Sequence, residues 1–169
     1  MWKEMQAKVS EVTSKPMPNW VSRYTDTTGE IQFKESICQM MEKYWTKRNI
    51  EPSQIAVQAG CGSILDSLFW LLYNEGDSVI LLGPIYPNFL LDAFMRALVN
   101  IEVAKTSWES NFALTEDILE SAYQNALSHG SPPKILLLCQ PCNPTGKLYS
   151  HDELSLCISW CRNHSLHLI

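Results

Sequence analysis

The sequence lacks any uninterrupted apolar run of about 18 residues, the length that a membrane-spanning helix requires. Its first residues, MWKEMQAKVSEV, carry charges where a secretory signal peptide would be apolar. We therefore expect neither a membrane span nor a secretory signal. A cytoplasmic location follows as an expectation, with the six cysteines mostly present as free thiols.

Basic residues are also scarce. Thirteen Lys and Arg stand against eighteen Asp and Glu, so the net charge is -5, and no basic run could follow a phosphate backbone. This balance argues against a nucleic-acid-binding surface. A content of 46% hydrophobic and 18% charged residues is typical of a globular protein, and 169 residues suffice for one well-filled domain.

Short apolar runs alternate with helical patterns along the chain. The expected strands are 55–58, 78–82, 100–104, 135–139 and 166–169. The expected helices are 4–12, 30–48, 63–74, 88–99, 115–129 and 150–163. This alternation predicts an α/β fold, a three-layer sandwich around a mostly parallel sheet.

The stretch 134–146, KILLLCQPCNPTG, is the most informative part of the sequence. Its apolar run is typical of a strand buried on both faces. Pro141 prevents the strand from continuing, and Pro144 restricts Asn143 to an extended or turn conformation. This predicts that Asn143 lies just past the carboxyl end of a buried strand, where ligands bind in open α/β sheets. A proline-rich connection without a ligand is the alternative.

Two further junctions carry candidate binding residues. Cys61, Gly62 and Ser63 belong to a glycine turn, AGCGS, at the start of a helix, where free N–H groups can bind a phosphate. Ser63 could instead be only the helix N-cap. In GPIYPN, Tyr86 is set in a rigid loop and could stack on a planar heterocycle, or pack on the surface. We expect both junctions at the same sheet edge as Asn143.

These motifs resemble the class I/II aminotransferases of fold type I, which depend on pyridoxal 5'-phosphate. Within that family the sequence resembles the branch of the 1-aminocyclopropane-1-carboxylate synthases. The resemblance rests on TDTTGE, AGCGS, PIYPNF, NPTG and the closing HLI. It implies a homodimer with its site between the subunits, acting on amino acid and 2-oxo acid substrates.

The resemblance also implies a role for each candidate residue. Cys61, Gly62 and Ser63 would hold the cofactor phosphate, Tyr86 would stack on the pyridine ring, and Asn143 would donate to the phenolic oxygen. For the domains, it implies an N-terminal arm or small-domain segment at 1–29. Residues 30–169 would be the N-terminal, incomplete part of the large domain.

The sequence departs from the family pattern in two respects. Thr27 stands where the synthase branch has a Tyr, which favours a general aminotransferase over a synthase-like lyase. The Schiff-base lysine would lie beyond Ile169, and the position of Lys147 does not match it. We therefore expect a truncated chain that has no catalytic residue and does not catalyse alone, although the complete protein would be an enzyme. A synthase-like lyase and a non-catalytic truncated paralogue remain alternatives.

Cysteine spacing offers a different class of function. Cys139, Cys142, Cys157 and Cys161 resemble a four-thiolate zinc site. However, Cys157 and Cys161 lie one helical turn apart on a predicted apolar stripe, which favours small buried thiols in a core. We expect core cysteines and no metal site, with a zinc-binding module as the alternative.

Overall fold

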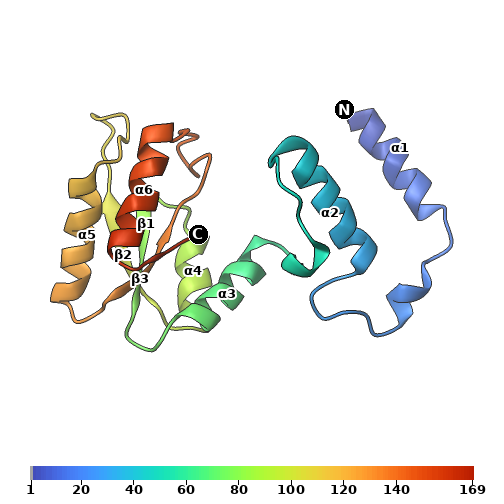
Figure 1. The fold of residues 1–169 in the computed structure, drawn as a ribbon, viewed down its shortest axis with the longest axis horizontal. Helices are drawn as coiled ribbons and strands as arrows, with labels where there is room; N and C mark the ends of the chain where they lie inside the picture. Colours follow the sequence, from blue (N-terminus) through green and yellow to red (C-terminus); the bar gives the residue numbers. More distant parts are fainter. Residues whose placement is uncertain (1) are drawn as a thin grey trace. The chain divides into compact units, whose positions relative to one another are not determined.

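A computed structural model describes residues 2–169 of the chain (Figure 1). The chain forms two compact units: unit 1 extends to Gln58, and unit 2 comprises Ala59–Ile169. Within residues 2–169, no helix combines the length and the apolar composition that crossing a membrane requires.

Unit 1 consists of helices and connecting loops. Its elements are α1 (Trp2–Thr13), the 3-10 helix η1 (Asn19–Ser22), α2 (Ile31–Tyr44) and the 3-10 helix η2 (Pro52–Gln54). The carboxylate of Glu30 begins α2 by accepting the Phe33 N–H at 3.0 Å. The two helices predicted in this part of the sequence are therefore confirmed, although α2 ends four residues earlier than predicted.

The first predicted strand, at 55–58, is wrong. Ile55 has an extended backbone, but residues 55–58 pair with no strand in the described part of the chain. The Val57 N–H donates instead to the carbonyl of Thr28 at 2.8 Å. Extended backbone becomes a strand only when a neighbour completes its hydrogen-bond ladder.

Unit 2 is built on a four-stranded, wholly parallel sheet with the strand order β2-β1-β3-β4. The strands are β1 (Ser78–Gly83), β2 (Asn100–Lys105), β3 (Pro133–Leu137) and β4 (His167–Leu168). The predicted parallel sheet is thereby confirmed. Because all strands run the same way, the loops that follow them leave from one edge of the sheet.

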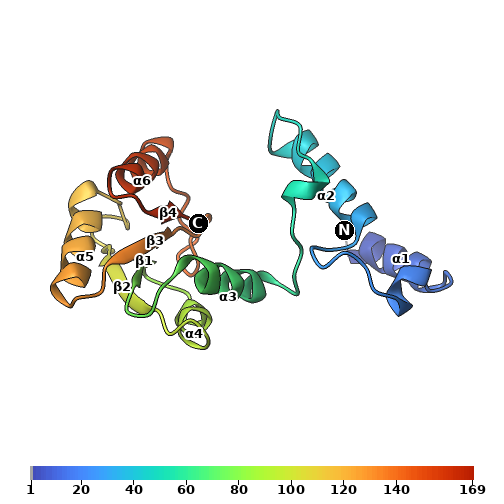
Figure 2. The same cartoon turned by 60° about the horizontal axis from the view of Figure 1, so that its bottom comes forward.

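Helices cover both faces of this sheet (Figure 2). One face is covered by α5 (Glu116–Ser128) and α6 (His151–Asn163), and the other by α3 (Cys61–Leu72) and α4 (Asn88–Phe94). Side chains alternate between the two cores: Ile80 and Leu136 pack with α5 and α6, whereas Val79 and Ile135 pack with α3. The three-layer arrangement is confirmed.

Two helix ends show how local sequence sets the connections. At the start of α6, Ser150 and Glu153 form the predicted capping box, with the Glu153 carboxylate accepting the Ser150 N–H at 2.8 Å. In contrast, α4 is shorter than the predicted 88–99. Leu98 adopts a left-handed φ of 53°, and the chain turns directly into β2.

Candidate functional site

The loops that follow β1 and β3 meet at the carboxyl edge of the sheet. The Cys142 thiol donates to the Pro84 carbonyl at 3.9 Å. Ile85 and Phe89, on either side of Tyr86, line one small hollow together with Asn143. Asn143 therefore lies close to the loop that carries Tyr86, as the parallel sheet predicts.

Asn143 projects from a turn that two backbone hydrogen bonds close. The Cys142 N–H donates to the Lys147 carbonyl at 2.8 Å, and the Gly146 N–H donates to the Cys142 carbonyl at 2.7 Å. Gly146 has a φ of 72°, which is why a glycine suits this position. The exposed Asn143 amide makes no hydrogen bond with any residue in the described range 2–169, so it is free to bind a ligand.

Tyr86 lies in the loop that follows β1, at the same edge of the sheet, with 37% of its surface exposed. Its ring packs edge-on against Phe89, with the ring centroids 5.5 Å apart and the planes at 88°. Such an edge-to-face pair favours one orientation of each ring. Tyr86 thus has both a packing partner and an exposed surface.

The glycine turn leads directly into α3. Gly60 has a φ of 87° and precedes Cys61, the first residue of the helix. The Ser63 hydroxyl donates to the Ala59 carbonyl at 2.9 Å, so Ser63 is not the N-cap that the simpler interpretation proposed. No side chain caps α3, and the N–H groups of its first turn stay available to an anion.

Asp92 of α4 lies beside this turn, and sequence reasoning missed it. A Cβ added at Gly62 would lie 3.0 Å from Asp92 Oδ1, so the glycine lets the carboxylate approach the first turn of α3. A carboxylate at that place benefits from the helix dipole and weakens the attraction for a second anion. No hydrogen bond between residues 2–169 joins the glycine turn to Asn143.

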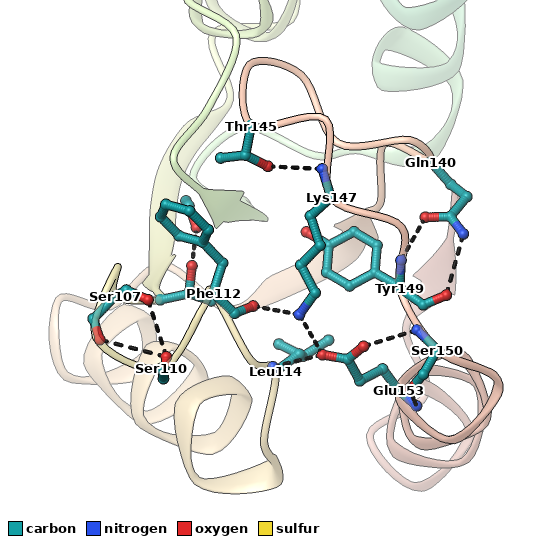
Figure 3. A network of polar contacts seen from close by, with 12 residues as sticks. Ser107, Ser110, Phe112, Leu114, Gln140, Thr145, Lys147, Tyr149, Ser150 and Glu153 are labelled. Carbon is teal, nitrogen blue, oxygen red and sulfur yellow. Dashed lines mark hydrogen bonds and ion pairs between the residues drawn. The ribbon is translucent and has the colours of Figure 1, made fainter.

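Lys147 and Glu153 form a second feature that the sequence did not reveal (Figure 3). The Lys147 ammonium donates to a Glu153 carboxylate oxygen at 2.5 Å and to the Phe112 carbonyl at 2.6 Å. Glu153 could be recognised from its capping motif. Nothing in the sequence indicates the contact between Lys147 and Phe112, which are 35 residues apart.

The four cysteines of the zinc-binding alternative, Cys139, Cys142, Cys157 and Cys161, are not gathered into a group of ligands in the described part of the chain. Within residues 2–169, no three His, Cys, Asp or Glu side chains gather in a way that could hold a metal ion. Cys157 and Cys161 lie in the core, where burial raises the pKa of their thiols to about 11 and about 12. A thiol must lose its proton to bind zinc, and the raised pKa of these two buried thiols opposes that step.

Comparison with known proteins places these observations in a family context. Residues 7–169 match the family described as aminotransferase class I and II. The chain is 31% identical over 147 residues to 1-aminocyclopropane-1-carboxylate synthase 9 of Arabidopsis thaliana, and 27% identical over 150 residues to synthase 2 of Solanum lycopersicum. These matches cover 86% and 88% of this chain and 31% of each relative, so the chain spans about a third of their length.

Solved structures share the fold. The aspartate aminotransferase of Thermus thermophilus with maleate superposes with a TM-score of 0.73 at 22% identity, over 86% of this chain and 36% of the other. BacF of Bacillus subtilis superposes with a TM-score of 0.76 at 22% identity, over 94% of this chain and 38% of the other. Both comparisons agree with the α/β architecture.

Proposed function

We propose, because the chain belongs to the class I and II aminotransferase family, that the complete protein is a pyridoxal-phosphate-dependent aminotransferase of amino acids and 2-oxo acids. It would act as a cytoplasmic homodimer with its site between the subunits. Within it, residues 1–29 would form an N-terminal arm, and 30–169 the first part of the large domain. The chain spans about a third of these relatives, and we assign part of the cofactor site to its residues.

The glycine turn fits the phosphate of this cofactor. The first turn of α3 has no side-chain cap, and a Cβ added at Gly60 would meet no atom within 4 Å. Cys61, Gly62 and Ser63 would therefore bind the phosphate through their backbone N–H groups, and the Ser63 hydroxyl would join them by giving up its bond to the Ala59 carbonyl. The nearby Asp92 carboxylate opposes this binding by charge repulsion, so we expect its side chain to turn away when the phosphate binds.

Asn143 and Tyr86 would orient the ring of the cofactor. The Asn143 amide would donate a hydrogen bond to the phenolic oxygen, and the Tyr86 ring would stack on the pyridine. The bound cofactor supplies an electron sink for the pair of electrons released at the amino acid's Cα. Lys147 is held by Glu153 and Phe112, which supports a structural role for this lysine and not a nucleophilic one.

The observation that carries this proposal is the free Asn143 amide, on a turn with two closing hydrogen bonds beside the Tyr86 loop. We expect Asn143→Ala to weaken binding of pyridoxal phosphate by about tenfold, the worth of one hydrogen bond to a charged oxygen. The measurement is a titration of the chain with the cofactor, followed by quenching of tryptophan fluorescence. Asn163→Ala, at the exposed end of α6, is the matched control and should bind like the wild type.

The titration has two outcomes that would count against the proposal. A wild-type chain that fails to bind pyridoxal phosphate would remove the assignment of the cofactor site to these residues. Equal affinities for the wild type and Asn143→Ala would remove the role given to Asn143.

A synthase-like lyase is the second candidate, favoured by the similarity to 1-aminocyclopropane-1-carboxylate synthases. Against it, Thr27 stands at the position where the resemblance implies that the synthase branch has a Tyr. The Asp26 carboxylate accepts the Thr28 N–H at 2.7 Å, which leaves Thr27 exposed at the tip of the turn. Assaying the complete protein for a 2-oxo acid product and for 1-aminocyclopropane-1-carboxylate separates the two reactions. If the complete protein forms neither product, that result would support a non-catalytic paralogue.

A further inference from the structure

The Lys147–Glu153 ion pair is largely shielded from solvent. Only 14% of the Lys147 side chain and 16% of the Glu153 side chain are exposed, and the charged atoms lie 2.5 Å apart. Figure 3 shows the Lys147 side chain reaching across to both Glu153 and the carbonyl of Phe112. A shielded pair loses more than an exposed pair when one partner is removed, because the remaining charge is left without a partner.

Glu153 joins three segments that are distant in the sequence. One of its oxygens accepts the Leu114 N–H at 2.9 Å, from the connection that follows β2, as well as the Lys147 ammonium. The other accepts the Ser150 N–H at 2.8 Å, at the start of α6. The carboxylate therefore connects the loop after β2, the loop after β3 and the first turn of α6.

Lys147 is also the residue that closes the Asn143 turn. Its carbonyl accepts the Cys142 N–H at 2.8 Å, and its N–H donates to the Thr145 hydroxyl at 3.2 Å. The backbone of Lys147 thus closes the Asn143 turn, and its side chain connects this turn to α6 through Glu153. Any displacement of Lys147 must move Asn143 relative to the sheet.

We propose that Lys147 and Glu153 are positioning residues, whose ion pair fixes Asn143 in the place from which it would contact the cofactor. This inference rests on the proposed function, since it specifies how one of the cofactor contacts is held. Neither residue touches the cofactor in this proposal. Their effect passes through the turn that carries Asn143.

Hydrogen exchange tests the structural half of the inference without the cofactor. In Lys147→Met, the Cys142 and Gly146 amides should exchange about tenfold faster or more, whereas the β1 amides should change much less. Lys105→Met, an exposed lysine at the end of β2, is the matched control and should change neither group. Equal acceleration of the turn and of β1 would indicate general destabilisation and would overturn the inference.

Cofactor affinity tests the functional half. Lys147→Met should weaken binding of pyridoxal phosphate by about the same tenfold as Asn143→Ala, since both lose one positioned contact. The double variant should bind no more weakly than Asn143→Ala alone, because Lys147 acts only through Asn143. Lys147→Arg should recover part of the affinity, because the guanidinium can still pair with Glu153.

The two readouts keep the two proposals apart. Losses that add in the double variant, or normal affinity in Lys147→Met, would overturn the positioning role while leaving the cofactor site in place. If the wild-type chain bound no pyridoxal phosphate, the proposed function would fail, and the exchange experiment would still decide whether the ion pair holds the turn.

Discussion

Replacing Trp160 with alanine is expected to lower the free energy of unfolding of unit 2 by about 3–5 kcal/mol. The side chain is 1% exposed and lies in the larger core cluster, between α6 and the sheet. Truncation would remove a large buried apolar surface and leave a cavity that the surrounding rigid strands cannot fill. No other aromatic side chain in residues 2–169 combines this volume with such complete burial.

Trp160 also has polar and aromatic partners that alanine would lose. Its indole N–H donates to a Glu120 carboxylate oxygen at 3.2 Å, and Tyr123 packs edge-on against its ring with the centroids 5.8 Å apart. The His164 ring lies over the indole at 4.4 Å and contacts the same Glu120 carboxylate at 3.0 Å. The substitution would therefore loosen the contact between α5 and α6 as well as the core.

Urea unfolding followed by circular dichroism measures this effect, with the midpoint and slope fitted for each variant. Trp160→Phe should lose less than the alanine variant, because most of the buried volume remains. Trp108→Ala is the matched control: this side chain is 79% exposed, and the expected loss is below about 1 kcal/mol. Similar losses for Trp160→Ala and Trp108→Ala would show that the core assignment is wrong.

Much of the fold of unit 2 follows from the sequence pattern. Short apolar runs at Val79–Leu82 and Ile135–Leu137 have partners on both faces, so an unbroken apolar sequence is sufficient to identify them. The run at 55–58 has the same character but forms no strand. An apolar pattern reports only that these residues favour an extended backbone. A strand also needs a neighbouring strand to pair with, which the local sequence does not specify.

The candidate site was predictable to a similar extent. Parallel strands bring the loops after β1 and β3 together, so the proximity of Asn143 to the Tyr86 loop could be predicted from topology alone. The approach of Asp92 to Gly62 depends on how two helices pack, and the bond from Lys147 to Phe112 depends on the path of a distant loop. Neither leaves a periodic or motif signal in the sequence.

Lowering the pH is expected to reduce the free energy of unfolding by about 2–3 kcal/mol through protonation of Glu153 alone. Partial burial acts to raise the pKa of this carboxyl group, but the Lys147 ammonium and the N–H groups of Ser150 and Leu114 outweigh it. The pKa falls from its ordinary 4.5 to about 2. Because the folded chain holds the proton less tightly than the unfolded chain, this stabilisation is fully present above pH 4.5 and is lost as the pH falls towards 2.

The variant Glu153→Gln isolates this contribution, because it removes the titrating group and resembles the protonated acid. The stability gap between the wild type and Glu153→Gln should be widest near neutral pH and should shrink to about half by pH 3. Urea unfolding at a series of pH values measures the gap. Glu116→Gln, which removes an exposed carboxyl group from the first turn of α5, is the matched control and should give a smaller gap at neutral pH. If the gap for Glu153→Gln stayed constant between pH 7 and pH 3, the ion pair with Lys147 could not be the source of the lowered pKa. The positioning role inferred for that pair would then lose its electrostatic basis.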